Sequence, residues 1–130
     1  MNVKAFSLME IVAVLVIIAV LAAIAIPMMH ARIDSGKWSE ANATAGIIQR
    51  AVRVYFSETG DKNVCTTLED PSTQVKLGLH PEDLSGVFFV AGDYRIADIT
   101  PTGIATVVVT GSQSNAPTGS KTLASSGTWH

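Results

Sequence analysis

Three histidines and one cysteine are the side chains of this 130-residue chain best suited to metal binding or nucleophilic catalysis. His30, His80 and His130 lie far apart in the sequence, and none has a second histidine or a cysteine four positions away, as paired zinc ligands on a helix do. Cys65 is the single cysteine, which excludes an internal disulfide and a zinc site made of cysteines. Lys62 is the one basic residue close to it in the sequence, so we expect an ordinary thiol rather than a nucleophile.

Nucleotide, calcium and nucleic-acid sites are not indicated either. The chain has no Walker loop and no GxGxxG pattern. Residues 61–63 (Asp-Lys-Asn) begin like a calcium loop, but the positions that follow do not continue the pattern. The formal net charge is −2, with nine basic and eleven acidic residues, so a Lys/Arg surface for nucleic acid is not expected. The sequence therefore predicts no enzyme activity, no cofactor and no metal site.

Glu10 is the charged residue whose position is most informative. It lies at the edge of an uncharged, apolar run from Ile11 to Met29, interrupted only by Pro27. A carboxylate at membrane depth costs about 2.5–3.5 kcal/mol on insertion scales unless it is paired. Glu10 could lie in the lipid headgroup region, or it could pair with a cation, for which Lys4 is the only nearby side chain.

The apolar run itself is long enough to cross a bilayer, because 19 helical residues approach the ~30 Å of the hydrocarbon core. Three interpretations compete. The run could be a cleaved secretory signal with Ala23-Ile24-Ala25 as its cleavage site. It could be an uncleaved anchor for a small exported domain. It could also be a segment whose start is processed and which then takes part in assembly.

The residues before the run favour the third interpretation. Lys4-Ala5-Phe6-Ser7-Leu8-Met9-Glu10, followed by the apolar run with Pro27 near its end, resembles the class III signal of type IV pilins and of the pseudopilins of type II secretion systems. The resemblance covers roughly residues 4–33. It implies that a prepilin peptidase cuts between Ala5 and Phe6 and that the new amino group of Phe6 is N-methylated. It also implies that Glu10 pairs with the N-terminal ammonium of a neighbouring subunit. Ala5 stands where the family usually has Gly.

The same resemblance implies a function, a location and partners. We expect a homo-oligomeric helical filament of the type IV pilus kind. Its precursor would cross the inner membrane once and then leave the bilayer for an extracellular or periplasmic filament, with the help of an assembly platform and its ATPase. A type II secretion pseudopilin is the alternative within the family. Some pseudopilins hold calcium in a C-terminal loop, and residues 112–126 have no Asp or Glu, so we do not expect that site here. The alternative from another class is a small exported or membrane-anchored binding domain.

The elements that must position these residues can also be predicted. Residues 6–58 are expected to form one long helix, bent or loosened at Pro27. In its second half an apolar stripe follows spacings of three and four, through Trp38, Ala41, Ala45, Ile48, Val52 and Tyr55. Glu40, Gln49, Arg50 and Arg53 lie on the other face. The segments are then a leader (1–5), a transmembrane and assembly helix (6–29), its amphipathic continuation (30–60) and a β-rich head (61–130).

The head is expected to begin with a loop over residues 61–85 that contains one helical turn after Pro81. Alternating apolar residues and short turns then predict an antiparallel meander. The expected strands are residues 87–90, 94–99 and 104–109, with 121–124 as an edge strand. The predicted fold is α+β, a long N-terminal helix packed on a small sheet of three or four strands, and this is the pilin-like arrangement.

Overall fold

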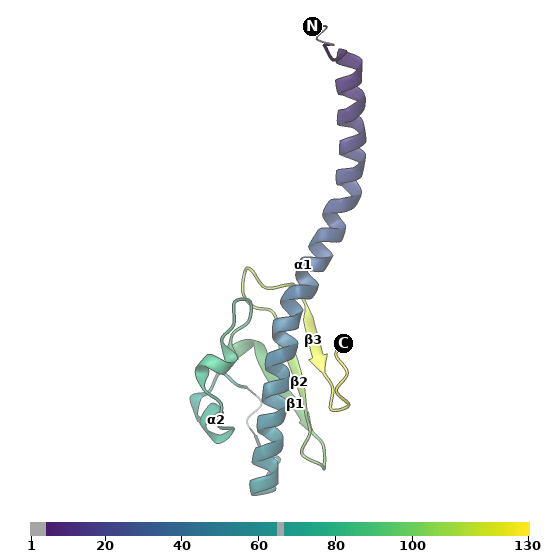
Figure 1. The fold of residues 1–130 in the computed structure, drawn as a ribbon. Coiled ribbons are helices and arrows are strands. Elements are labelled where there is room, and N and C mark those ends of the chain that lie inside the picture. Colours follow the sequence, from purple (N-terminus) through teal and green to yellow (C-terminus); the bar gives the residue numbers. More distant parts are fainter. Residues whose placement is uncertain (1–4, 65–66) are drawn as a thin grey trace. The chain divides into compact units, whose positions relative to one another are not determined.

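The structure, a computed structural model, describes residues 5–64 and 67–130 and consists of two compact units. The first extends to Ser35, and the second, here called the head, is Gly36–His130. Helix α1 (Leu8–Thr59) contributes to both units (Figure 1). The head adds the short helix α2 (Pro71–Lys76) and the strands β1 (Tyr94–Ile99), β2 (Ala105–Thr110) and β3 (Ser120–Leu123).

Helix α1 confirms the predicted long helix. It starts two residues later than predicted, at Leu8, and continues through Pro27 without interruption. It ends at Thr59, where Gly60 takes a positive φ of 67°, a conformation that favours glycine. The predicted apolar stripe is the face that packs on the head: Trp38, Ala41, Ala45, Ile48 and Val52 are buried and Tyr55 is half-buried.

The sheet is antiparallel with the order β1-β2-β3. Tyr94 pairs with Val109 at one end of the β1–β2 ladder, and Val107 pairs with Leu123 between β2 and β3. Along β2, buried residues alternate with half-buried ones, as expected when one face of a sheet covers a core. The α+β fold, one long helix on a small antiparallel sheet, is therefore confirmed.

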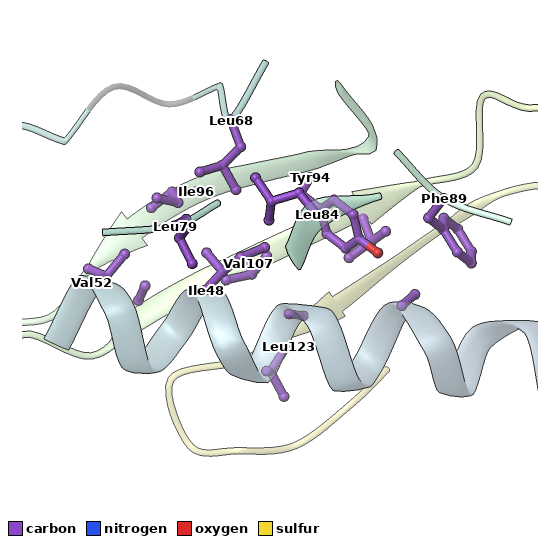
Figure 2. Packing of buried hydrophobic residues seen from close by; sticks show 14 of the residues in the cluster. Ile48, Val52, Leu68, Leu79, Leu84, Phe89, Tyr94, Ile96, Val107 and Leu123 are labelled. Carbon is purple, nitrogen blue, oxygen red and sulfur yellow. The ribbon is translucent and has the colours of Figure 1, made fainter. Parts of the chain in front are cut away.

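The core lies between the amphipathic half of α1 and the sheet (Figure 2). Ala41 and Ala45 of the helix are completely buried. Larger side chains close the layer from both sides, with Ile48 from the helix and Tyr94 and Val107 from the sheet. The connection between helix and sheet also contributes, through Leu68, Leu77, Leu79, Leu84 and Phe89.

One predicted strand is wrong. Residues 87–90 form no strand but an irregular segment, here called the 85–90 loop, that leads into a 3₁₀ turn at Ala91–Asp93. The backbone N–H groups of Val87, Phe88 and Phe89 donate to the carboxylate of Glu40 and so cannot form a ladder. The meander therefore has three strands.

Helix α2 lies within the predicted loop. Asp70 caps it, with one carboxylate oxygen accepting from the backbone N–H of Ser72 at 2.9 Å and the other from its hydroxyl at 2.8 Å. These bonds, the backbone one first, lower the pKa of Asp70 below its usual value. Pro71 is its first residue and Gly78 follows it at a φ of 65°. The turn predicted after Pro81 is present as a 3₁₀ helix, Pro81–Leu84.

Both edges of the sheet carry an additional bridge. Thr67 pairs with Arg95 beside β1, and Trp129 pairs with Leu123 beside β3. Thr122 and His130 exchange both backbone hydrogen bonds, at 3.1 and 3.0 Å. The segment after β3 thus turns back and runs along that strand.

Candidate functional site

The predicted processing site lies in the segment just before α1. Ala5, Phe6 and Ser7 belong to no helix or strand and are exposed, and Phe6 leaves 75% of its surface accessible. The helix begins at Leu8, where the carbonyl of Ser7 accepts a hydrogen bond of 3.0 Å from the N–H of Glu10. The Ala5–Phe6 peptide bond is therefore in accessible, non-helical backbone, which is the form that proteases bind. The first four predicted leader residues lie outside the described part of the chain.

Glu10 lies in the first turn of α1 with its side chain exposed. The N–H groups of a first helical turn have no intrahelical partner, and the positive end of the helix dipole is there, so this position favours a carboxylate. Phe6 is about one helical turn away from it along the chain, whereas Pro27 lies seventeen residues further on, about 25 Å along a helix. Ala5, Phe6 and Glu10 are thus neighbours along the chain at the start of α1, and Pro27 lies apart from them.

The surface of α1 that follows Glu10 is apolar on all sides. From Ala5 to Gly36 every residue is exposed except Ala22, which is half-buried. The side chains include long runs of Val, Ile and Leu, such as Val14 to Ile18, each between 49% and 60% exposed. This helix is long and apolar enough to cross a membrane, and none of its most apolar window is buried within the chain. Such a surface needs lipid or protein around it, because exposed apolar patches of this size are rare in monomeric soluble proteins.

A second arrangement of polar groups, within the head, holds the 85–90 loop to α1. Glu40 of α1 accepts three backbone hydrogen bonds from the 85–90 loop, at 3.2 Å from Val87, 3.0 Å from Phe88 and 3.2 Å from Phe89. A Cβ at Gly86 would overlap the same carboxylate, so a larger residue there would displace the carboxylate or the loop from this position. Glu40 therefore serves as the anchor of this loop.

Gln49, nine residues further along α1, binds the sheet region in a similar way. Its side-chain amide donates to the carbonyl of Ala105 at 2.8 Å and to that of Ala124 at 3.2 Å. Sequence analysis assigned Glu40 and Gln49 only to the polar face of the helix. Their long-range partners have no signature in the sequence, apart from the glycine at position 86.

Tyr94 and Asp93 lie at the start of β1 and are buried. The carboxylate of Asp93 accepts from the backbone N–H groups of Val90 (2.9 Å) and Ser112 (3.1 Å). Burial raises the pKa of Tyr94 to about 12, although its hydrogen bond with Thr44 acts in the opposite direction. These groups are engaged with the protein itself, which indicates a structural role.

The raised pKa of Tyr94 predicts a loss of stability in alkali. The pKa of Tyr94 is about 12 in the folded chain and 10.0 for an ordinary tyrosine, so between these pH values the unfolded chain binds fewer protons than the folded one. The free energy of unfolding should therefore be unchanged below pH 10 and fall as pH rises towards 12. Urea titrations monitored by tryptophan fluorescence at several pH values would measure this. The fall should disappear in Tyr94→Phe, and an equal fall in that variant would contradict the assignment to Tyr94.

The three histidines considered for catalysis lie in different parts of the described structure. Among the described residues, no three His, Asp or Glu side chains gather closely enough to hold a metal ion. His80 lines a mainly apolar surface hollow of about 290 Å³, and it is the one titratable side chain of that lining. His30 and His130 are exposed in α1 and in the segment after β3. Cys65 lies outside the described residues.

The comparisons with known proteins add no family to this description. Neither the protein-family models, nor the curated proteins, nor the solved structures give a match to the chain. The geometry on which a functional conclusion can rest is that of residues 5–29: an accessible segment, a carboxylate in the first helical turn, and an exposed apolar helix surface.

Proposed function

We propose that this chain is a structural subunit of a type IV pilus-like filament, assembled from the membrane through packing of its N-terminal helix. The observation that carries the proposal is the fully exposed apolar surface of α1 between Glu10 and Met29, with a single carboxylate at its start. That surface would first be solvated by lipid and later by the same surface of neighbouring copies.

Processing would come first in this function. A prepilin peptidase would cut the exposed Ala5–Phe6 bond and leave Phe6 as the N-terminal residue, to be N-methylated. The cut removes Lys4 and creates a positive charge at Phe6, one helical turn from Glu10. Exposure of the bond and its position before the first helical turn support this step.

Assembly would then be directed by charge and driven by packing. In a bundle of such helices, an axial offset of one subunit lets each Glu10 meet the ammonium group of the next. A carboxylate buried without a partner is penalised by several kcal/mol, so the pair would select the correct offset more than it adds stability. Lipid is as apolar as these side chains, so close packing of Ala, Val and Ile supplies the attraction between helices.

Extraction from the bilayer requires work from outside this chain. No nucleotide-binding motif occurs in the sequence, so an assembly platform with its own ATPase would supply the energy. The precursor would therefore be a single-pass protein of the inner membrane, and the product a filament in the periplasm or outside the cell.

The mass of the mature chain tests the proposal directly. Protein extracted from membranes should start at Phe6 and carry one methyl group, as measured by intact-protein mass spectrometry. A mature chain that starts at Ile26, after Ala23-Ile24-Ala25, would contradict the proposal and indicate a secreted domain. An uncut chain would indicate a membrane-anchored binding domain. Electron microscopy of sheared surface material, together with a secretion assay in a deletion strain, would then separate pilus from secretion pseudopilus.

A further inference from the structure

One end of the head combines aromatic rings with lysines. Trp38 of α1 packs against Phe89 at a ring-centre distance of 5.2 Å and against Trp129 at 6.1 Å. Lys121 of β3 lies over both tryptophan rings, 6.0 Å from the centre of Trp38 and 5.9 Å from that of Trp129. We call this cluster, together with Lys37, Val87 and Phe88, the aromatic end of the head.

The 85–90 loop presents an apolar side chain at this end. Val87 leaves 69% of its surface exposed. Its backbone is nevertheless fixed on both sides, because its N–H donates to Glu40 and its carbonyl accepts from the side-chain amide of Asn115 at 3.0 Å. Next to it, Phe88 is half-buried with the ammonium group of Lys37 5.4 Å from its ring centre. Val87 is therefore an exposed apolar side chain whose backbone is held in place.

The charges at this end favour an anionic partner. Lys37 and Lys121 are the cations of the cluster. Of the carboxylates near it, Glu40 and Asp93 accept backbone hydrogen bonds, and Asp34 stands one helical turn before Lys37 on α1. The acidic residues of the head are otherwise concentrated in the connection that carries α2, at Asp61, Glu69, Asp70, Glu82 and Asp83. The head therefore has a basic, aromatic end and an acidic connection.

The position of this end along the chain indicates which anionic partner it meets. Lys37 follows Met29, the last residue of the apolar run, by eight residues. Eight residues span about 12 Å as a helix and at most about 28 Å fully extended. The aromatic end is therefore tied near the point where α1 would leave the bilayer. Tryptophan and lysine are the residues that membrane proteins place at the lipid headgroups, where rings lie at the polar boundary and cations face phosphate.

We propose that, before assembly, the aromatic end of the head rests on the headgroup layer of a membrane that contains anionic lipid. Val87 and the ring of Phe88 enter the boundary between headgroups and acyl chains, and Lys37 and Lys121 face lipid phosphates. This inference rests on the proposed membrane insertion of α1. The inference adds that the membrane also binds the head. A subunit that leaves the bilayer would then lose both the contact of α1 with lipid and the contact of the head with the headgroups.

The chain contains its own probes for a test, because its two tryptophans, Trp38 and Trp129, both belong to the aromatic end. The full-length chain is reconstituted in vesicles of phosphatidylcholine, with and without phosphatidylglycerol. A lipid that carries a nitroxide on its headgroup is then compared with one labelled at the end of its acyl chain. We expect the headgroup label to quench tryptophan emission more strongly, most in the anionic vesicles, and added salt to weaken this quenching. Each lysine should contribute about fivefold to the preference of the head for the anionic surface.

Two exposed valines of the head give a matched pair of variants. Val87→Glu should lower headgroup contact about tenfold, as judged from the quenching. Val75→Glu changes an equally exposed valine (78%) on α2 and should leave the quenching unchanged. Equal effects of the two substitutions would overturn the inference. Should Val87→Glu fail to fold, the comparison of lipids and the salt dependence of the unmodified chain still decide the question.

The result also separates this inference from the proposed function. If the chain floats with the vesicles but headgroup quenching is absent, only the membrane contact of the head is wrong. If the chain does not float with the vesicles, the proposed insertion of α1 fails. Quenching that rises with the protein-to-lipid ratio and not with anionic lipid would assign the aromatic end to contacts between copies and contradict the inference.

Discussion

Replacement of Glu10 by alanine is expected to leave the chain in the membrane and to abolish filament growth. The substitution removes the carboxylate from the first turn of α1, and with it the proposed partner of the ammonium group at Phe6 of a neighbouring copy. Leaving one member of a buried ion pair alone costs about 3 kcal/mol or more, which corresponds to docking weakened by at least about a hundredfold at each junction. Sedimentation of sheared material and electron microscopy measure the filaments, and vesicle flotation measures insertion.

Variants of the same residue separate charge from shape. Glu10→Gln keeps the size of the side chain and removes its charge, so it should fail as Glu10→Ala does. Glu10→Asp keeps the charge on a shorter side chain and should retain part of the filament yield. Glu58→Ala, an exposed carboxylate close to the other end of α1, is the control and should assemble normally. Normal filaments from Glu10→Ala would remove the assembly role from this residue.

Loss of the Glu40 carboxylate is expected to have the largest effect on the stability of the head. Glu40→Ala leaves the three backbone donors of the 85–90 loop without their acceptor, and two of these bonds are partly buried. Hydrogen bonds to charged groups contribute about 1.5–3 kcal/mol each, and solvent can replace part of them here, so we expect a loss of about 2–4 kcal/mol. Denaturant titration of the full-length chain in detergent, followed by the fluorescence of Trp38, measures the free energy of unfolding.

The neighbouring glycine offers an independent check of the same contact. Gly86→Ala keeps the carboxylate but places a methyl group where it lies, so the carboxylate or the loop must shift and part of the same loss is expected. Gly46→Ala is the matched control, because a Cβ there meets nothing within 4 Å and the position lies within α1. That substitution should stabilise the head slightly, since alanine favours a helix by about 1 kcal/mol over glycine. If Glu40→Ala unfolds at the denaturant concentration of the unmodified chain, the loop is held by other contacts.

The long helix and the strands β1 and β2 could be predicted because their signals in the sequence are strong and local. A stripe at spacings of three and four over eighteen residues can only be satisfied by a helix, and Trp38 to Val52 are indeed its buried face. Strands β1 and β2 alternate in burial and are separated by a turn that contains proline and glycine, so their positions agree with the prediction within one residue.

The wrong or missing predictions concern segments whose structure depends on polar groups distant in the sequence or on short polar stretches. Residues 87–90 have the composition of a buried strand, but the distant carboxylate of Glu40 accepts the N–H groups of the first three, and Asp93 accepts that of Val90. Helix α2 has only six residues, and its buried positions are the polar Thr73 and Gln74, so no apolar period marks it. Within the candidate site, the pattern around Phe6 and Glu10 could be recognised from the sequence, whereas the partners of Glu40 and Gln49 could not.

The covered edges of the sheet have a consequence for a protein that would polymerise at high local concentration. An uncovered edge strand offers a row of N–H and C=O groups to any second sheet, which is how β-rich domains aggregate. Here the bridges at Arg95 and Leu123 occupy part of both edges. Heads crowded along a fibre would then stay separate from one another by default. Subunits would then join the fibre through the apolar surface of α1. Because this surface can bind and separate without unfolding of the head, such a fibre could be taken apart again.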